Sequence, residues 1–367
     1  MKILHICCNL AGSTVFPQLF EALKREGIAQ TVFVPEKSAA NLGKNRPAGV
    51  ETHAALTVKK SDALLFFRKA QRSVPEIERS IDLSGVTLIH AHTLFTDGSI
   101  ARRLSARTGI PYIVTLRYSD IEVIYKYEPH LRPLARAILR GASYVVFLSG
   151  AGRDKVLSGW LHDKDRAVIA GRTAVIPNGI DPAWLTGSPR GPLKEMVRVG
   201  FAGLYNRRKR PLDAIAAVHE AADRSGRPFV FAACGSGPLE EALKAQLREG
   251  DCLCGRIEGR EAMKRFYAGC DLLLVPSEAE TFGMVYLEAM SQGVPVLYTR
   301  GQGFDGQFGE GEVGFSVACG DVGEQAARLI DAAQDYEARS ARCIERAARY
   351  AWTQVAAQWK ALYQGIG

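Results

Sequence analysis

Two carboxylates in the second half of the chain, Glu280 and Glu288, have a type and spacing suited to binding hydroxyl groups. Glu280 follows a Pro-Ser turn and would lie just before a helix that we expect to begin near Phe282 or Gly283. The first backbone N–H groups of a helix have no partner within it and carry partial positive charge. The amides of Phe282, Gly283 and Met284 could therefore hold an anion or an array of hydroxyls. Glu280 would accept hydrogen bonds beside them.

Glu288 would lie two turns further along the same helix, among the apolar residues Val285, Leu287, Ala289 and Met290. A carboxylate in such surroundings needs a partner to offset the loss of its hydration. The vicinal hydroxyls of a ribose would supply one. The two glutamates together predict a site that binds a polyol and a phosphate. The alternative is a helix cap followed by a surface glutamate.

The setting of the two glutamates resembles the signature of the family 4 glycosyltransferases, which have the two-domain GT-B architecture. The chain reads Pro-Ser-Glu-Ala-Glu-Thr-Phe-Gly over 276–283 and Glu-Ala-Met-Ser-Gln-Gly-Val-Pro-Val over 288–296. Val-Ile-Pro-Asn-Gly-Ile-Asp at 175–181 is a second close match. The resemblance implies a retaining hexosyltransferase that uses a nucleoside diphosphate sugar, with UDP or GDP most favoured as the nucleotide. It also implies no metal and no other cofactor.

The resemblance extends to the basic loop that begins at Gly203. Family members usually place an Arg soon after this glycine and a Lys further on, and both contact the donor diphosphate. Lys209 fits the second position, but Leu204 occupies the first, so Arg207 or Arg208 would have to substitute. The alternative is a solvated basic loop.

Glu280 and Lys209 are the predicted catalytic residues. Lys209 would supply fixed positive charge where the departing diphosphate develops negative charge. By resemblance, Glu280 would position the hydroxyls of the donor sugar and support positive charge at its anomeric carbon. Gly235 and Gly237, after another predicted strand, would allow close contact with the nucleotide. No covalent nucleophile is evident, so attack by the acceptor on the same face of the sugar is implied by the resemblance alone.

Residues at the expected strand ends of the first half predict the acceptor side. Gly12 and Ser13 follow the first strand, where small residues permit close approach of a ligand. His90 and His92 end the third strand, and the family often has a similar His-x-His here. Such a pair could bind a metal, but no third ligand is evident nearby in the sequence. A structural or acceptor-side role is therefore the preferred interpretation, and we expect no metal site.

Arg117 marks a departure from the family pattern. The segment Thr-Leu-Arg-Tyr-Ser-Asp at 115–120 aligns with a family segment that commonly reads Thr-x-His-Gly-x-Asp. Arg117 stands where the family often has His, so the role of that His does not carry over. Arg117 could hold a phosphate or a sugar carboxylate. The alternative is an arginine paired with Asp120.

The elements that position these residues alternate along the whole chain. Apolar segments predict strands at Lys2–Cys7, Gln30–Val34, Val86–His90, Tyr112–Thr115, Tyr144–Leu148, Val197–Ala202, Phe229–Ala233, Asp271–Val275 and Val294–Tyr298. Helical patterns predict Val15–Arg25, Asp62–Arg79, Ser99–Arg107, Leu131–Arg140, Pro211–Asp223 and a helical tail over Ala326–Tyr363. This alternation predicts an α/β fold with parallel sheets covered on both faces. Ligands of such folds bind beyond the carboxyl ends of the strands.

The length of 367 residues predicts two domains. The GT-B resemblance specifies two Rossmann-like doubly wound parallel-sheet domains facing a cleft. We expect an acceptor-binding domain over residues 1–185 and a nucleotide-sugar-binding domain over 186–350. Residues 351–367 should form a C-terminal helix that crosses back to pack on the first domain.

The net charge of +8 is unevenly shared. Residues 1–190 contain 26 Lys and Arg against 16 Asp and Glu, which gives +10, and the remainder, with 21 against 23, gives −2. Arg132, Arg136 and Arg140 would form a basic stripe on one helix, and the helix expected over 62–79 is also basic and amphipathic. Such surfaces can rest on anionic lipid. We hypothesise peripheral membrane contact through this half, and the alternative is core-facing helices with solvated basic faces.

The remaining features constrain the compartment and the chemistry. We expect a cytoplasmic protein, since the N-terminus lacks a helix-length apolar region with a cleavage site. The eight Cys have no disulfide or zinc spacing and are interpreted as reduced packing residues. Asp163-Lys164-Asp165 resembles a metal-binding Asp-x-Asp motif but is interpreted as a charged, solvated loop.

The expected partners are a nucleotide sugar and a glycan or lipid-linked acceptor of bacterial surface polysaccharide synthesis, with no nucleic acid. The alternatives are a GT-B epimerase or phosphorylase, a dehydrogenase, or a non-catalytic sugar-nucleotide-binding protein.

Overall fold

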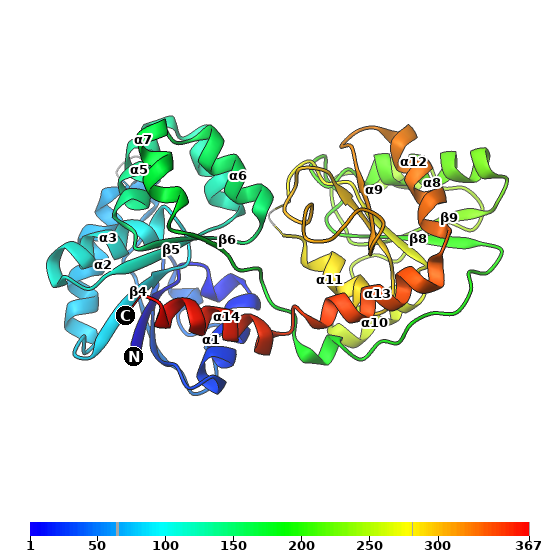
Figure 1. The fold of residues 1–367 in the computed structure, drawn as a ribbon. Helices are drawn as coiled ribbons and strands as arrows, with labels where there is room; N and C mark the ends of the chain where they lie inside the picture. The colour runs from blue at the N-terminus through cyan, green and yellow to red at the C-terminus, as the bar shows by residue number, and fades with distance from the viewer. Residues whose placement is uncertain (64–65, 281, 367) are drawn as a thin grey trace. The chain divides into compact units, whose positions relative to one another are not determined.

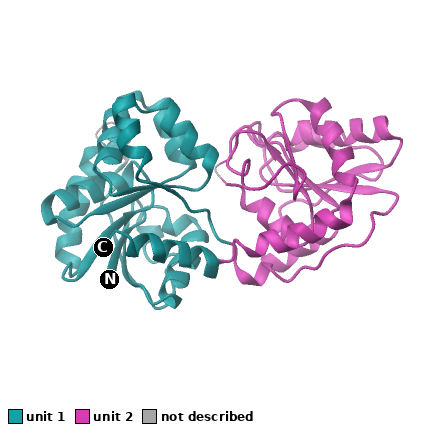
Figure 2. Ribbon diagram, viewed as in Figure 1, with its two compact units in different colours: residues 1–179, 352–367 teal, residues 180–351 magenta. Residues whose placement is uncertain are grey.

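The structure of the protein is a computed structural model that describes residues 1–63, 66–280 and 282–366. The chain forms two compact units, shown in separate colours in Figure 2. Unit 1 comprises residues 1–179 and 352–367, and unit 2 comprises residues 180–351. The boundary after residue 179, where unit 1 passes into unit 2, comes earlier than the predicted domain boundary after residue 185. The end of the chain returns to unit 1.

Unit 1 is built on a seven-stranded parallel sheet with the order β3-β2-β1-β4-β5-β6-β7 (Figure 1). The strands are β1 (Lys2–Ile6), β2 (Ala29–Pro35), β3 (Glu51–Ala55), β4 (Val86–Ala91), β5 (Tyr112–Leu116), β6 (Tyr144–Phe147) and β7 (Thr173–Val175). The sequence does not predict the edge strands β3 and β7. Neither edge strand contains a fully buried residue, so each lacks the continuous apolar run of a central strand.

Helices cover both faces of this sheet (Figure 1). They are α1 (Val15–Arg25), α2 (Phe67–Ser80), α3 (Thr96–Thr108), α4 (Tyr125–Tyr127), α5 (Arg132–Gly141), α6 (Gly150–Gly159), α7 (Asp163–Ala170) and α14 (Trp352–Gln364). The predicted helix start at Asp62 is wrong. Asp62 lies in a short 3-10 turn, where its carboxylate accepts a hydrogen bond from the Lys59 amide, and α2 begins at Phe67. Leu64 and Leu65, part of the same predicted helix, lie outside the described residues.

Alternate residues of the central strands of unit 1 form two apolar layers, one on each face of the sheet. Ile89 and Ala91 of β4 belong to the layer that contains the apolar residues of α2, α3 and α5. Leu88 belongs to the other layer, together with residues of α1 and of α14, including Trp352 and Trp359. The last helix of the chain is therefore part of the core of unit 1, and Figure 1 shows it beside α1.

Unit 2 contains a six-stranded parallel sheet with the order β10-β9-β8-β11-β12-β13. Its strands are β8 (Val197–Ala202), β9 (Phe229–Cys234), β10 (Cys252–Leu253), β11 (Leu272–Val275), β12 (Val296–Thr299) and β13 (Gly314–Val317). Its helices are α8 (Pro211–Ser225), α9 (Glu240–Lys244), α10 (Arg260–Ala268), α11 (Met284–Met290), α12 (Val322–Ala333) and α13 (Tyr336–Ala348). The predicted helical tail is thus divided among α12, α13 and α14. The first break lies at Asp335, whose φ is 47°, and the second lies between Ala348 and Trp352.

The two parallel α/β sheets confirm the predicted fold class. Among the described residues, no helix is both long enough and apolar enough to span a bilayer.

Candidate active site

Lys209 and Glu280 form an ion pair in unit 2, with 2.5 Å between Nζ and Oε2. Their side chains are 15% and 17% exposed, so the pair is largely shielded from water while keeping an open side. Lys209 follows β8 and Glu280 follows β11, which are neighbouring strands of the sheet. The carboxyl ends of parallel neighbours meet at one edge, and this brings together two residues 71 positions apart. The two predicted catalytic residues are therefore in direct contact.

The backbone around Glu280 is held by neighbouring loops. Its amide donates to the side-chain oxygen of Gln302 at 3.0 Å, and its carbonyl accepts from the Gly303 amide at 2.8 Å. Glu278, two residues earlier, donates its amide to the carbonyl of Arg208 at 2.8 Å. The loop that contains Arg208 and Lys209 is thus hydrogen-bonded to the loop that contains Glu280. Leu204, at the position where the family has Arg, is 55% exposed.

The predicted glycine residues form a close backbone crossing beside this pair. A Cβ atom built on Gly235 would lie 1.8 Å from the carbonyl oxygen of Gly203, and one on Gly237 would lie 2.6 Å from that of Tyr205. Gly235 has a φ of 148°, and the Gly203 amide donates to the carbonyl of Cys234 at 3.0 Å. Only glycine fits at position 235 without moving the neighbouring loop. The loops after β8 and β9 therefore approach each other backbone to backbone at these glycines.

The helix after Glu280 begins later than predicted. Phe282 is buried and precedes the helix, Gly283 is its N-cap residue with a φ of 80°, and the first helical residue is Met284. A side chain at position 283 would overlap the ring of Tyr286, where a Cβ would come within 2.4 Å. The prediction that the helix starts near Phe282 or Gly283 thus agrees with the structure to within one or two residues. The helix α11 has seven residues.

Glu288 lies half-buried on α11, where the hydroxyl of Tyr267 donates to its Oε2 at 2.9 Å. Burial raises the pKa of Glu288 above its usual value, and the hydrogen bond from Tyr267 opposes this shift. Tyr267, on α10, is fully buried and was not among the predicted site residues. Its position 21 residues from Glu288 gives no periodic signal in the sequence. The carboxylate thus already has one donor, which leaves acceptor capacity for further hydroxyls.

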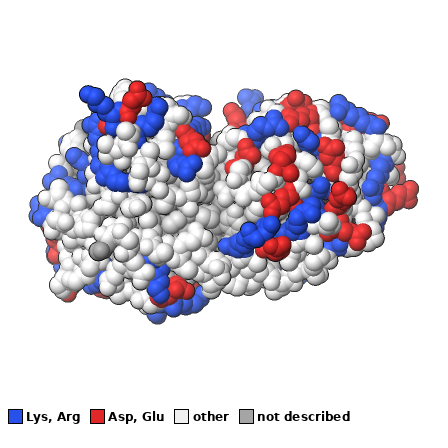
Figure 3. Space-filling view, viewed as in Figure 1, with Lys and Arg blue, Asp and Glu red and all other residues white. Residues whose placement is uncertain are grey.

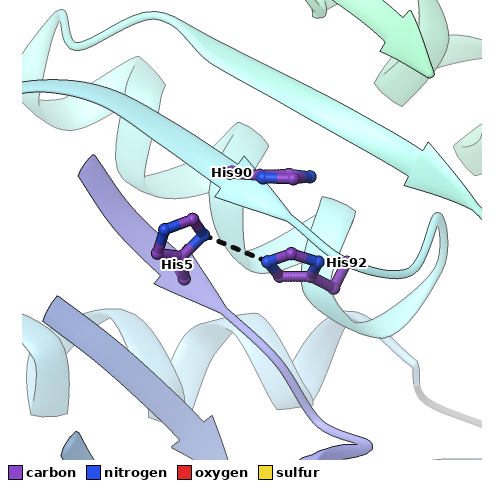
Figure 4. A group of neighbouring side chains, drawn as sticks. All are labelled: His5, His90 and His92. Carbon is purple, nitrogen blue, oxygen red and sulfur yellow. Dashed lines mark hydrogen bonds between the residues drawn. The ribbon is translucent and has the colours of Figure 1, made fainter. Parts of the chain in front are cut away.

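In unit 1, three buried histidines cluster on the face of the sheet that packs against α1 and α14. Figure 4 shows the rings of His5, His90 and His92. His5 Nδ1 and His92 Nε2 lie 3.1 Å apart and share a hydrogen bond. The sequence predicted no third imidazole near the His-x-His pair, and this is wrong. His5 pairs with His90 in the register of β1 and β4, which the strand spacing alone does not reveal.

These imidazoles already form a hydrogen-bond network. His90 Nδ1 lies 2.7 Å from the Tyr363 hydroxyl and Nε2 lies 2.8 Å from Oγ1 of Thr115. The rings of His90 and His92 have centroids 3.9 Å apart and planes tilted by 33°, and both ring nitrogens of His90 are already engaged in these hydrogen bonds. Burial lowers the pKa of His5 to about 3 and holds the pKa values of His90 and His92 well below their usual range. The arrangement suits neutral imidazoles that tie β1 and β4 to α14.

Arg117 is occupied by contacts within unit 1. Its Nε donates to the carbonyl of His92 at 3.1 Å, one terminal nitrogen donates to Oδ1 of Asn178 at 3.1 Å, and its guanidinium lies over the ring of Phe16. The carboxylate of Asp120 accepts from the backbone amide of Arg117 at 2.9 Å. The guanidinium of Arg117 is thus bonded to His92 and Asn178, and only its backbone amide contacts Asp120, so the side-chain pair with Asp120 is not observed.

Asp97, which the sequence places at the opening of the helix after the His-x-His strand, is a buried acid near Arg117 and Asp120. Its Oδ1 accepts from the Cys8 amide at 3.0 Å, and its Oδ2 has no partner among the described residues. Burial raises the pKa of Asp97 to about 7 and that of Asp120 to about 6. A polar, buried cluster thus lies at the carboxyl edge of the unit 1 sheet.

Gly12 and Ser13 lie between β1 and α1. Gly12 is exposed, and a Cβ at its position would meet nothing within 4 Å, so its backbone does not require glycine. The hydroxyl of Ser13 accepts a hydrogen bond from the Val15 amide at 3.2 Å, at the start of α1. The structure therefore gives Ser13 a local structural contact and gives Gly12 no tight packing.

The basic stripe of α5 contacts other parts of unit 1. Arg132 donates to the carbonyl of Tyr125, Arg136 to that of Trp160, and Arg140 pairs with Asp165. Figure 3 shows Lys and Arg side chains over the part of unit 1 that carries α5 and α7.

The Asp163-Lys164-Asp165 segment is not a solvated loop, which corrects the prediction. Asp163 begins α7, and Asp165 is buried and accepts from the Arg140 guanidinium at 2.6 and 2.7 Å. Asp165 therefore anchors α7 to α5. Of the cysteines, Cys7, Cys234, Cys270 and Cys343 are buried, as their interpretation as packing residues requires, whereas Cys254 and Cys319 are exposed.

Two family models together match most of the chain. Residues 11–179 match the glycosyl transferase 4-like domain, and residues 191–350 match the glycosyl transferases group 1. The chain is 26% identical to TuaC of Bacillus subtilis, named for teichuronic acid biosynthesis, over 61% of this chain and 55% of that protein. It is 23% identical to the alpha-maltose-1-phosphate synthase of Mycolicibacterium smegmatis over 89% of each chain.

The matches to the first relatives are partial. The matched region is 32% identical to the sulfoquinovosyl transferase SQD2 of Arabidopsis thaliana but spans only 30% of that protein. Similar solved structures cover the whole of this chain. The lipopolysaccharide outer core galactosyltransferase WaaB has a TM-score of 0.75 at 14% identity, with 99% of its chain covered. Anabaena Alr3699/HepE in complex with UDP has a TM-score of 0.74 at 18% identity, with 100% covered.

Proposed function

Since the chain belongs to the group 1 glycosyltransferases and has their GT-B fold, we propose that it transfers a hexose-type sugar from a nucleoside diphosphate sugar with retention of anomeric configuration. The observation that carries this proposal is the ion pair between Lys209 and Glu280. A cation and a carboxylate in direct contact at the end of a parallel sheet suit a reaction in which opposite charges separate. The acceptor is a glycan or a lipid-linked glycan of bacterial surface polysaccharide synthesis.

The chemical demand on the site is the departure of a diphosphate. Lys209 supplies positive charge toward the diphosphate oxygens as negative charge develops on them. Glu280 binds the hydroxyls of the donor sugar and stabilises positive charge at the anomeric carbon. When the donor binds, it replaces the direct contact of the two side chains with contacts to its own diphosphate and sugar. The loop contacts of Arg208 and Gln302 keep the two residues in place during this exchange.

The transfer step needs no group beyond the two substrates. The bond between the anomeric carbon and the diphosphate oxygen breaks, and its electron pair passes to the diphosphate. The acceptor oxygen bonds to the same face of the sugar, and its proton passes to the departing oxygen. We propose that the donor site works without a metal, because Lys209 supplies the fixed positive charge.

The nucleotide is held by Glu288 and by the glycine loops. Glu288 accepts hydrogen bonds from the ribose hydroxyls, while the hydroxyl of Tyr267 donates to Oε2 of the same carboxylate. Gly203 and Gly235, which have no side chains and cross backbone to backbone, would let the nucleotide approach the two loops closely. UDP is the first nucleotide to test, since the similar structure of Alr3699/HepE holds UDP and, in another crystal, UDP-glucose. GDP is the second.

The acceptor side is assigned to the carboxyl edge of the unit 1 sheet. The proposal of a surface glycan is supported by the names of TuaC and WaaB, and that of a lipid-linked acceptor by the phosphatidyl-myo-inositol mannosyltransferase of Mycobacterium leprae, which is 28% identical over 67% of this chain. We further propose a cytoplasmic protein that contacts anionic membrane through its basic unit 1. Flotation with liposomes containing phosphatidylglycerol at low salt tests this contact, and an absence of binding removes it.

The experiment that tests the donor site is a thermal-shift screen with UDP-, GDP- and ADP-sugars, with and without EDTA. A ligand that binds only the folded state raises the midpoint by mass action. We expect one nucleotide class to stabilise the wild type equally in both conditions. Glu288→Ala should lose this response, and Glu249→Ala, at an exposed position of the same unit, should keep it.

Product analysis completes the test. The anomeric proton of the product should show the configuration of the donor by NMR. If no sugar nucleotide shifts the midpoint, or if EDTA abolishes the shift, the metal-independent donor site is refuted. Donor binding without transfer or hydrolysis in the presence of candidate acceptors would instead identify a non-catalytic binding protein, and epimerised donor would identify an epimerase.

A further inference from the structure

A cavity of about 520 Å³ lies in unit 2 at the edge of the sheet opposite to Lys209 and Glu280. Arg198 lies near the amino end of β8, and Asp271 directly precedes β11, and both line it. Lys209 and Glu280 follow the carboxyl ends of the same two strands. Six residues of β8 span roughly 20 Å. The cavity is therefore separate from the candidate donor site.

Two residues that line this cavity carry a side-chain donor for whose proton no acceptor is found among the described residues. One donor is the Nε–H of Arg198, and the other is the hydroxyl of Tyr336, a residue that is 5% exposed. The Tyr336 hydroxyl accepts a hydrogen bond from Arg190, whose guanidinium also donates to the carbonyls of Tyr267, Ala268, Cys270 and Gln292. Because a guanidinium has no acceptor, the proton of the hydroxyl remains unpaired. An unpaired buried donor costs free energy. A ligand with acceptor oxygens would satisfy both groups.

The charges around the cavity favour an anion. Arg190, Lys194 and Arg198 line it against one carboxylate, Asp271, which accepts from the backbone amide of Arg198 at 2.8 Å. Lys194 is exposed and forms no ion pair within the described part of the chain. Tyr336 is also the first residue of α13, a helix of 13 residues whose N-cap residue makes no side-chain hydrogen bond. The carboxylates of Asp335 and Glu337 at this helix start oppose its partial positive charge, so the favourable charge for an anion comes from the side chains of Lys194 and Arg198.

We propose that this cavity binds a small organic phosphate. Arg198 and Lys194 would contact the phosphate oxygens, and the Tyr336 hydroxyl would donate to one of them. A volume of about 520 Å³ is within the range of small-molecule sites and is large enough for a sugar phosphate. The proposal does not depend on the transferase reaction, because none of its residues belongs to the candidate donor site.

The test is a calorimetric titration of the full-length protein with glucose 6-phosphate, with glucose as the uncharged probe. We expect binding of glucose 6-phosphate only. Arg198→Met should weaken this binding at least about tenfold, and Tyr336→Phe, which removes one hydroxyl from a buried ring, should weaken it about threefold to tenfold. Arg256→Met, at an arginine that is 76% exposed in the same unit, is the matched control and should bind as the wild type does.

Three results would overturn the proposal. The first is no binding at millimolar glucose 6-phosphate. The second is binding that Tyr336→Phe leaves unchanged, and this variant decides the outcome if Arg198→Met does not fold. The third is binding that Lys209→Met abolishes while the cavity variants retain it, because the probe would then occupy the donor diphosphate site. A loss confined to the cavity variants supports the cavity even if no sugar nucleotide binds elsewhere.

Discussion

The hydroxyl of Tyr267 donates to the carboxylate of Glu288 at 2.9 Å and orients it within unit 2. Removing this hydroxyl in Tyr267→Phe should raise the pKa of Glu288 further, because the hydrogen bond favours the ionised form. We expect the affinity for the stabilising nucleotide to fall about fivefold to tenfold at pH 7 and to recover partly as the pH rises.

Calorimetric titration across pH checks this prediction. Tyr298→Phe is the matched control, because Tyr298 is an equally buried tyrosine of the same unit without a described hydroxyl contact to Glu288. Equal affinities for Tyr267→Phe and the control would show that this hydrogen bond does not prepare the carboxylate for its ligand.

The ion pair of Lys209 and Glu280 predicts strong coupling between their substitutions. Lys209→Met and Glu280→Gln should each lower kcat by about 100-fold or more, since each removes charge stabilisation from the transition state. The double variant should lose much less than the product of the two single losses, because the residues act as one unit. Steady-state kinetics of the four proteins measures this. Independent, multiplicative losses would contradict a shared role.

The backbone crossing predicts that Gly235 tolerates no side chain. In Gly235→Ala the new Cβ would overlap the carbonyl of Gly203, which forces the two loops apart. We expect nucleotide-induced thermal stabilisation to disappear while the two-unit fold, followed by circular dichroism, persists. Gly309→Ala serves as control, since its Cβ would have only a contact of 3.5 Å with a flexible glutamate side chain. Normal nucleotide binding by Gly235→Ala would show that the crossing is not required.

Asp97 predicts a specific pH dependence of stability. Burial raises its pKa from 3.8 to about 7, so its contribution to folding is complete below about pH 3.8 and is lost as the pH rises toward 7. Asp97→Asn keeps an acceptor for the Cys8 amide but cannot ionise. The variant should be more stable than the wild type at pH 8, on the order of a few kcal/mol, and the two should converge near pH 4.

Urea unfolding between pH 4 and pH 8 measures this difference. The buried histidines act in the opposite sense, because their lowered pKa values make folding less favourable as the pH falls below 6.5. Both proteins contain these histidines, so the difference between the proteins isolates Asp97. Asp154→Asn, at a 67% exposed position, should show no such trend. A constant difference across this pH range would contradict the assignment to Asp97.

The hydrogen bond between His90 and Tyr363 predicts that the Tyr363 hydroxyl stabilises the packing of α14 on the sheet of unit 1. Tyr363→Phe removes the hydroxyl 2.7 Å from His90 Nδ1 and leaves that nitrogen buried without its partner. We expect a loss of about 1–3 kcal/mol in the free energy of unfolding of unit 1. Denaturant unfolding, with Tyr127→Phe at a 67% exposed tyrosine as control, checks it. Equal stabilities of the two variants would show that the hydroxyl contributes nothing.

Sequence reasoning predicted elements that have a clear apolar pattern, although it missed β13, most of whose residues are buried. Val15–Arg25 and Val197–Ala202 match α1 and β8 at both ends, because a strong apolar pattern and clear boundaries coincide there. The edge strands β3 and β7 lack that pattern and were missed. The start of α2 was misplaced because Asp62 forms a local turn that competes with the helix.

Single residues of the candidate site could be predicted from sequence motifs. Contacts between residues that are distant in the sequence could not. Glu280 and Lys209 were identified one by one, but their mutual contact follows from the adjacency of β8 and β11. His5 and Tyr267 contact predicted residues through strand register and helix packing, which leave no spacing signal. Arg117 was left with two interpretations because its contacts to His92 and Asn178 come from distant segments.

The return of α14 to unit 1 has a consequence for the order in which the protein can fold during synthesis. Unit 2 is a continuous segment and leaves the ribosome before the chain is finished. Unit 1 begins first but lacks Trp352, Trp359 and Tyr363 of its core until α14 emerges. Its apolar face next to α1 therefore stays uncovered while unit 2 is made. Unit 2 can complete its fold before unit 1. Loss of α14 would leave the core of unit 1 incomplete.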